Sequence, residues 1–276
     1  TVSVNICALG GSVGTGPEGV VAGVVEVKSF EELKALGTKG VQGKIVFFNR
    51  AMDPTQLNTF AAYGGAVNQR GSGATEAARL GAVAALVRSM GSNLEDYPHT
   101  GGMSYAPDVK KIPAVAISTR HAEMLSKLLK EDKDLQFYIE THSEMLEDAP
   151  SFNVIGEIKG SEYKDEIIVV GGHLDSWDLA QGAHDDGAGC VQSIEVLRIF
   201  KSMGYKPKRT IRAVMYMNEE NGLRGGLKYA ELAAANKEKH IAAIESDRGG
   251  FTPRGFTVSG TATAKATVLG WKNLLE

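Results

Sequence analysis

The order of strands and helices in residues 151–276 is the feature that most constrains the fold of this chain. Short apolar runs typical of strands alternate with longer segments in which apolar residues recur at helical spacing. This alternation favours a largely parallel sheet that helices cover on both faces. The expected strands of this region are 152–158, 166–171, 209–217 and 241–246, and the expected helices are 187–203 and 223–235. The first two strands flank a polar turn, which predicts that they pair with each other.

Side chains suited to metal binding stand where these strands end. His173 follows the second expected strand, and Asp185 begins the helix after it. Glu219 and Glu220 follow the third strand, and Asp247 follows the fourth. Because parallel sheets bind ligands at the carboxyl ends of their strands, we expect these segments to meet at one edge. An imidazole with carboxylates suits zinc, cobalt or manganese, so a metal site is predicted there, although an acidic pair alone is as often a solvated surface feature.

Residues 18–147 show a second alternation of the same kind. The expected strands are 20–27, 44–48, 82–88 and 114–117, and the expected helices are 30–36, 74–80 and 120–130. Residues 89–111 are polar and rich in glycine and proline, which predicts a long loop. Residues 1–17 hold a short apolar segment and the start of the glycine-rich run GGSVGTGPEG. The chain is therefore expected to form an α/β protein with two regions.

Composition excludes several classes of function. The formal charge of −3 gives no basic footprint for nucleic acid, and no apolar run is long enough to span a membrane. Cys7 and Cys190 form no disulfide or metal-binding pattern, so we predict two buried free thiols. The serine-nucleophile motif GxSxG, the zinc motif HExxH and the Walker A pattern are all absent.

Four motifs carry a resemblance to a known family. They read HLDSWD at 173–178, QGAHDDGAG at 181–189, EENGLRGG at 219–226 and IESDRGGFTPRGF at 244–256. Together they resemble the co-catalytic zinc exopeptidases, the clan of the bacterial leucyl aminopeptidases and of glutamate carboxypeptidase. Within that clan they are most similar to the plasma glutamate carboxypeptidase group, the carboxypeptidase Q type. The resemblance implies a smaller α/β protease-associated insert at 18–147, and a partial zinc-peptidase catalytic domain made of 1–17 and 148–276.

The resemblance also implies roles for the polar residues at the strand ends. His173 and Asp247 would bind the first zinc ion, and Asp185 would bridge it to the second. Glu220 would bind the second ion. Glu219 would be the general base that takes a proton from the water between the metals. Two cations held by a bridging carboxylate lower the pKa of that water and polarise the scissile carbonyl group.

Neighbouring residues are expected to support this site. Asp175 would assist catalysis by accepting the second ring N–H of His173, which fixes the tautomer of the imidazole. The resemblance predicts a cis peptide bond between Asp185 and Asp186. His184 stands beside Asp185, and we favour a bystander role over a ligand role for this side chain.

Other residues of the motifs keep two interpretations. Ser176, Trp177 and Asp178 could shape a substrate pocket, or they could pack and cap the loop, and the sequence does not decide between these. No substrate-binding residue is predicted. The remaining histidines lie outside the motifs, where exposed polar roles are expected: His99, His121, His142 and His240.

The chain departs from the clan at the fifth metal ligand, a downstream histidine. No histidine follows residue 240, so the second zinc ion would have only Asp185 and Glu220. A catalytic zinc usually has three protein ligands. The chain starts with Thr1 and shows no signal peptide. We therefore expect a fragment truncated at both ends, which binds one metal poorly and has little activity, of an active parent.

The expected parent is a zinc-dependent exopeptidase. It would hydrolyse dipeptides, or remove terminal residues from short peptides, through a water molecule activated by two metals. One alternative is an aminopeptidase of the same clan, and another is a non-catalytic receptor-like or scaffold member. The resemblance also implies secretion or a periplasmic location, a small peptide as partner and a homodimer as one possible assembly. No nucleic acid or membrane is expected as a partner.

Overall fold

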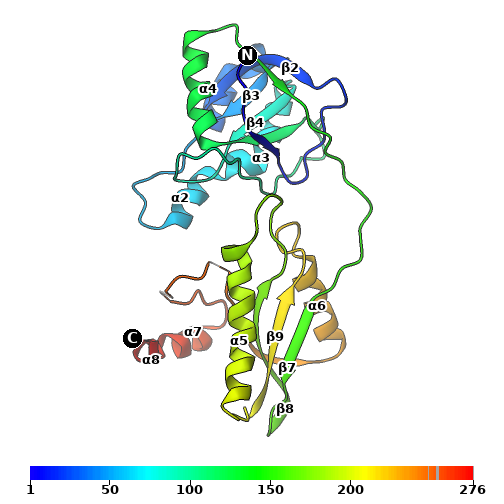
Figure 1. The fold of residues 1–276 in the computed structure, drawn as a ribbon, viewed down its shortest axis with the longest axis vertical. Coiled ribbons are helices and arrows are strands. Elements are labelled where there is room, and N and C mark those ends of the chain that lie inside the picture. Colours follow the sequence, from blue (N-terminus) through cyan, green and yellow to red (C-terminus); the bar gives the residue numbers. More distant parts are fainter. Residues whose placement is uncertain (248, 253–254, 276) are drawn as a thin grey trace.

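The computed structural model describes residues 1–247, 249–252 and 255–275, which form two sheets with helices around them (Figure 1). We call residues 6–139 the first unit, and the described part of residues 154–275 the second unit. The elements of the first unit are β1 (Ile6–Ala8), β2 (Val20–Val27), α1 (Phe30–Val41), β3 (Ile45–Phe48), α2 (Thr59–Ala66), α3 (Asn68–Arg79), β4 (Ala84–Arg88), β5 (Ala114–Ile117), α4 (Thr119–Glu131) and β6 (Gln136–Ile139). The elements of the second unit are β7 (Val154–Ile158), β8 (Tyr163–His173), the short π-helical turn η1 (Ala183–Gly187), α5 (Ala188–Ser202), β9 (Arg209–Tyr216), α6 (Arg224–Ala235), β10 (Lys239–Glu245), α7 (Ala262–Leu269) and α8 (Lys272–Leu275).

The first sheet has four parallel strands between two antiparallel edge strands. Its order is β1-β5-β4-β3-β2-β6. Neighbouring residues of a strand face opposite sides, so Phe48 packs with Leu33 of α1 on one face and Phe47 packs with Leu125 of α4 on the other. Because both faces are covered, the central strands are continuous apolar runs such as Ile-Val-Phe-Phe in β3.

Strand β1 belongs to this first sheet, whereas the sequence resemblance groups residues 1–17 with residues 148–276. Ile6 pairs with Ile117 and Ala8 pairs with Val115, which makes β1 an antiparallel edge strand next to β5. A strand of three residues has no periodicity from which its partner can be inferred. The structure alone supplies this pairing.

Other elements of the first unit differ in extent from the sequence prediction. Helix α2 and strand β6 are not predicted from the sequence, and α1 continues to Val41 instead of ending at residue 36. Gly37 within α1 has a φ of 59°, a conformation that glycine adopts without steric cost. Residues 89–111 form the expected loop, which makes a single bridge to Gly10 through Gly102.

The second sheet has the order β10-β8-β9-β7, with β7 antiparallel to the other three strands. The predicted pairing of segments 152–158 and 166–171 is wrong, because β9 lies between β7 and β8. A polar turn between two apolar runs resembles a hairpin in the sequence. The parallel pairing of β8 with β9 instead needs the crossover through α5, which no local pattern reveals.

Helices cover both faces of the second sheet, as expected. Val169 and Tyr229 of α6 belong to one apolar cluster, and Val170 and Leu197 of α5 belong to another on the opposite face. Figure 1 shows α5 and α6 on either side of the strands. The predicted α/β fold with a mixed, largely parallel sheet is therefore confirmed for this unit.

Two further findings concern membranes and cysteines. In the described part of the chain, no helix has the length and apolar character needed to cross a bilayer. Cys190 is buried, as predicted, whereas Cys7 is only half-buried, and both are free thiols. The Cys190 thiol donates a hydrogen bond to the carbonyl oxygen of His173 over 3.0 Å, so this side chain supports the end of β8.

Candidate metal and catalytic site

Three of the predicted metal ligands meet at one edge of the second sheet. His173 ends β8, Asp185 lies in η1, and Asp247 follows β10 by two residues. The Nε2 atom of His173 lies 3.1 Å from Asp185 Oδ1 and 3.0 Å from Asp247 Oδ1. Ligand atoms from the three side chains all lie within 4.8 Å of one another, so these residues could hold one metal ion.

The imidazole of His173 is held in a fixed orientation. Its side chain is 1% exposed, and its Nδ1 atom lies 2.9 Å from the main-chain carbonyl oxygen of Asp175. The Asp175 carboxylate is farther away, with Oδ1 at 3.9 Å. The second ring nitrogen is therefore held by the carbonyl group and not by the carboxylate that the sequence suggests. Either partner leaves Nε2 free to face Asp185 and Asp247.

The Asp175 carboxylate binds the main chain after β9 instead. Its two oxygens accept hydrogen bonds from the backbone N–H groups of Glu219, at 2.9 Å, and Glu220, at 3.1 Å. This pair of bonds links the loop after β8 to the loop after β9. Asp175 therefore fixes the position of both glutamates through their backbone.

Glu219 and Glu220 occupy different places around the cluster. Glu219 Oε2 lies 3.9 Å from Nε2 of His173, at the distance of a group that could act on a molecule bound between them. Reduced hydration raises the pKa of Glu219. Among the described residues, Glu220 is not part of the cluster that could hold one metal ion, but it lies close enough to Asp185 for the two carboxylates to repel each other.

Asp186 is a buried structural carboxylate. The peptide bond between Asp185 and Asp186 is cis, as predicted. The Asp186 side chain accepts hydrogen bonds from the backbone N–H of His173, at 3.0 Å, and of Gly189, at 2.9 Å. It thus ties the end of β8 to the start of α5, a role that the sequence did not indicate.

Two glycines are required because the backbone segments approach closely at this edge. A Cβ atom at Gly172 would lie 2.5 Å from Asp186 Oδ2, and one at Gly189 would lie 1.8 Å from the carbonyl oxygen of Ser246. Gly189 ends the motif at 181–189 and Gly172 directly precedes the motif at 173–178. Position in or beside a motif does not distinguish a required glycine from a tolerated one, so neither was predicted from the sequence.

The titrating groups of the cluster perturb one another. Burial alone lowers the pKa of His173, but the Asp175 carbonyl and the Asp247 carboxylate outweigh it and raise the pKa to about 9. Reduced hydration, with repulsion between the carboxylates, raises the pKa of Asp185 and brings that of Glu220 to about 7. A cation among these groups would offset the repulsion, so their charges suit a metal.

His184 contacts the loop that follows Asp247. Its ring stacks on Phe251 with a centroid distance of 4.8 Å, and its Nδ1 atom accepts a hydrogen bond from the Gly250 N–H over 3.1 Å. His184 is not part of the three-residue cluster in the described chain. The ring therefore connects the segments that carry Asp185 and Asp247.

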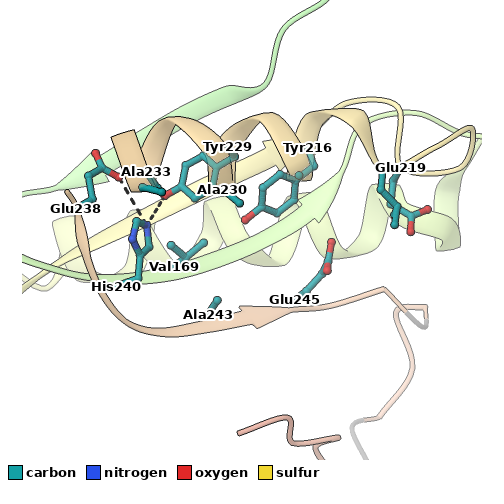
Figure 2. A pocket seen from close by; sticks show the side chains of 13 residues that line it. Val169, Tyr216, Glu219, Tyr229, Ala230, Ala233, Glu238, His240, Ala243 and Glu245 are labelled. Atoms are coloured by element: carbon teal, nitrogen blue, oxygen red, sulfur yellow. Dashed lines mark hydrogen bonds and ion pairs between the residues drawn. The ribbon is translucent and has the colours of Figure 1, made fainter. Parts of the chain in front are cut away.

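Two cavities adjoin the site. One, of about 520 Å³, lies between α6 and strands β8 and β10, with Glu219 and Glu245 at one end and Glu238 and His240 at the other (Figure 2). At the end with Glu238, the Tyr229 hydroxyl group and His240 Nε2 are joined by a hydrogen bond of 2.9 Å. The other cavity, of about 820 Å³, lies between the two units. It is lined by Gly10, Gly102, Met145, Asp175, Ser176, Asn218, Glu220 and Arg224, among others.

Comparison with known proteins identifies a peptidase family that the chain resembles. Residues 153–274 match the model of peptidase family M28. Carboxypeptidase Q of Bos taurus is 40% identical over 271 residues, which are 98% of this chain and 56% of the relative. Carboxypeptidase Q of Xenopus laevis is 41% identical over 274 residues, or 99% of this chain and 56% of the relative. The chain thus spans about half the length of these relatives.

Solved structures agree with the sequence comparison. A peptidase M28 precursor from Shewanella amazonensis has a TM-score of 0.88 at 37% identity, covering 97% of this chain and 60% of that protein. A zinc aminopeptidase from Bacillus subtilis has a TM-score of 0.61 at 23% identity, covering 89% of this chain and 53% of that protein. The second likeness shows a shared fold alone.

Proposed function

The chain belongs to peptidase family M28 through residues 153–274, and on that premise we propose that it carries the metal centre of a zinc exopeptidase. The observation that carries the proposal is the meeting of His173, Asp185 and Asp247 at one sheet edge, with Glu219 beside them. These residues come from the end of β8, from η1 and from the segment after β10. A convergence of this kind is the arrangement that a metal-dependent hydrolase requires.

The donor set fits zinc. One imidazole nitrogen and two carboxylate oxygens are three ligands of the type and number that catalytic zinc uses, with one position left for water or substrate. His173 would bind through Nε2, because its other ring nitrogen, Nδ1, makes a hydrogen bond with the Asp175 carbonyl oxygen. We propose that Asp185 and Glu220 would be the residues of this chain that hold a second zinc ion. Bound zinc would supply a water of lowered pKa and a polarised carbonyl group.

Glu219 is the proposed general base. Its carboxylate would accept a proton from the attacking water, whose oxygen forms a bond to the peptide carbonyl carbon. The same proton would then pass to the leaving nitrogen as the C–N bond breaks. The pKa of Glu219 is raised toward neutral pH, and a base with such a pKa can both accept a proton and return it. Asp175 would assist by holding the Glu219 backbone.

The proposed substrates are dipeptides and the terminal residues of short peptides. The cavity of about 820 Å³ between the units supports this, because residues of the first unit form one of its walls and limit its extent. We propose that residues 18–147 are a protease-associated insert with this role, and that the full-length protein is secreted or periplasmic. The substrates and the location are proposed for the full-length protein, because this chain spans 56% of the bovine relative.

An aminopeptidase is the second candidate, and the charge of the cavity favours it. Among the described residues, four carboxylates and two cationic side chains line the cavity: Glu147, Asp148, Asp175, Glu220, Arg224 and Lys228. Arg224 is itself paired with Asp148. A net negative lining would attract the free amino group of a peptide. Comparing cleavage of free and N-acetylated dipeptides tests this candidate, because an aminopeptidase requires the free amine whereas removal of a C-terminal residue does not.

The experiment that tests the proposal is Glu219→Gln in the full-length protein that carries this chain. We expect dipeptide hydrolysis to be abolished while zinc content stays unchanged, because the side chain keeps its size but cannot accept the proton. Glu162→Gln, an exposed change on the second unit, is the matched control. Turnover retained in Glu219→Gln would overturn the role of the base. Absence of both zinc and turnover in the unsubstituted protein would instead favour a non-catalytic scaffold.

A further inference from the structure

The ring of Trp177 lies between the first unit and the candidate metal site. Trp177 follows His173 by four residues, on the loop after β8 that also carries Asp175. We propose that Trp177 is a positioning residue: its ring rests against the backbone of Gly10 and Gly102, and its N–H holds the carboxylate of Glu220. The first unit would then set the position of a residue in the site of the second unit.

Gly10 and Gly102 form the surface on which the ring rests, and we call this pair the glycine seat. The two residues make an isolated parallel bridge. The Gly10 N–H donates to the Gly101 carbonyl oxygen over 3.0 Å, and the Met103 N–H donates to the Gly10 carbonyl oxygen over 3.0 Å. The seat therefore joins the glycine-rich segment before β2 to the long loop between β4 and β5, so its backbone is held from both sides.

The ring occupies the space that a side chain would need at the seat. A Cβ atom added to Gly10 would lie 2.6 Å from Cζ3 and 2.7 Å from Cη2 of Trp177. A Cβ atom added to Gly102 would lie 3.9 Å from Cη2. Contacts at 2.6 Å are too short for carbon atoms, so glycine is required at position 10 for space. The benzene edge of the indole is the part that faces the seat.

The opposite edge of the same ring reaches Glu220. The indole N–H is the only polar donor of a tryptophan side chain. Trp177 counteracts part of the rise in the pKa of Glu220, as an N–H that faces this carboxylate would. Because the indole is rigid, the place of its N–H follows from where its benzene edge rests. In the proposed arrangement Glu220 would be held at its backbone by Asp175, over 3.1 Å, and at its carboxylate by Trp177.

This inference rests on the proposed function, in which Glu220 is a ligand of the second zinc ion. Hydrogen-bond partners that orient a metal ligand typically contribute 10- to 100-fold in metal affinity or activity. Loss of the Trp177 N–H should therefore weaken the second metal by about 10- to 100-fold. It should affect the His173, Asp185 and Asp247 cluster much less, since none of these three is the acceptor.

The first test follows the Trp177 N–H directly by ¹⁵N–¹H NMR. The chain has two tryptophans, so Trp271→Phe leaves one indole signal. Glu220→Gln should shift that signal, and Gly10→Ala should shift it and speed its hydrogen exchange, because the ring is displaced from the seat. Gly71→Ala is the matched control, as a Cβ there would meet nothing within 4 Å in the same unit. An indole signal unchanged by both Glu220→Gln and Gly10→Ala would overturn the proposal.

The second test separates positioning from simple packing in the full-length protein. Trp177→Phe keeps an aromatic ring near the seat but removes the N–H. We expect zinc occupancy of the second site and kcat to fall by about 10- to 100-fold while the denaturant midpoint stays close to the original. Because phenylalanine is smaller, adding Gly10→Ala should cost little more than Trp177→Phe alone.

The outcomes of this second test also distinguish the proposal from the function on which it rests. If Glu219→Gln abolishes turnover but Trp177→Phe leaves kcat and zinc content unchanged, the positioning role is wrong and the peptidase function stands. If Glu219→Gln leaves turnover unchanged, the proposed function fails. The indole signal of the single-tryptophan chain would still report whether the ring joins the seat to Glu220.

Discussion

At the residue scale, two carboxylates beside the candidate ligands accept hydrogen bonds from backbone N–H groups. Asp175 holds the backbone of the two glutamates after β9, and Asp186 joins the end of β8 to the start of α5. Asp186 is 1% exposed, and its negative charge is compensated by these backbone N–H groups and by the nearby His173. Burial accordingly raises the pKa of Asp186. The geometry of the metal cluster therefore depends on acidic side chains that are not ligands themselves.

Replacing Asp186 with asparagine tests this structural role. In Asp186→Asn one of the two acceptor oxygens becomes an NH₂ group, which cannot accept from a backbone N–H. We expect the free energy of unfolding of the metal-free chain to fall by about 1.5–3 kcal/mol, the contribution of a hydrogen bond to a charged group. Urea unfolding measures the change, and Asp178→Asn, at an exposed position of the neighbouring loop, is the control. An unchanged urea midpoint for Asp186→Asn would contradict the role.

Zinc stabilisation should increase with pH in this chain. The pKa of Glu220 is raised from 4.5 to about 7, and that of His173 from 6.5 to about 9. Groups with raised pKa values contribute stability at low pH that is lost as the pH rises through the folded value. The metal-free chain should thus lose stability between pH 4.5 and pH 9, while zinc must displace the His173 proton and binds better as pH rises.

The pH series has a direct measurement. The zinc-induced rise in Tm should be smallest at about pH 5.5 and largest at about pH 8.5. Calorimetric titration in buffers of different ionisation enthalpy should show proton release on zinc binding near neutral pH. A rise in Tm that is the same at all pH values, with no proton release, would mean that zinc binds away from His173. His142→Ala, at an exposed site in the first segment after β6, should leave the series unchanged.

At the element scale, the start of α5 closely approaches the segment that follows β10 and carries Asp247. A Cβ at Gly189, in the first turn of α5, would lie 1.8 Å from the carbonyl oxygen of Ser246 and 2.4 Å from Asp186 Oδ1. The Ser246 oxygen belongs to the backbone, and the Asp186 carboxylate is held by two backbone N–H groups, so the start of α5 or the segment after β10 must move. We expect Gly189→Ala to cost about 3 kcal/mol or more, at the upper end for an overpacked site.

A second glycine provides the matched control for Gly189. Gly226 lies in α6, and a Cβ there would meet nothing within 4 Å. Gly226→Ala should stabilise the chain by up to about 1 kcal/mol, because alanine favours helix over glycine. Urea unfolding of both variants measures the contrast. Equal effects of the two substitutions would show that the approach of α5 to β10 does not limit the structure.

Elements with strong local patterns could be predicted from the sequence, and elements defined by distant partners could not. The central strands β3, β4 and β5 are buried on both faces and are apolar throughout, except for Arg88 at the end of β4. Strand β7 also has an apolar pattern, but its partner β9 lies beyond a helix in the sequence. Helix α2 is rich in small residues and has no clear apolar stripe, so its 8 residues gave no signal.

At the scale of the whole molecule, the meeting of distant ligands was predictable because the parallel sheet itself dictates it. Once β8 and β10 are parallel neighbours, His173 and Asp247 must emerge at the same edge. Which atom of Asp175 contacts the imidazole, and how Trp177 reaches the glycine seat, depend on loop paths and contacts between the two units. These contacts follow from the packing of segments that are distant in the sequence, so a pattern within one segment does not predict them.

The number of metal ions bound by this chain follows from the arrangement of its described residues. His173, Asp185 and Asp247 can act as three ligands for one ion, whereas a second ion would have Asp185 and Glu220 alone. Because a catalytic zinc usually needs three protein ligands, the cluster changes the sequence-based expectation of poor binding: we expect one tightly bound zinc per chain and a second that is lost on dialysis. His173→Ala should remove the tight zinc, and His99→Ala in the first unit should not. Two tight zinc ions per chain, or one that survives His173→Ala, would require ligands outside this cluster, and metal analysis after dialysis decides between these results.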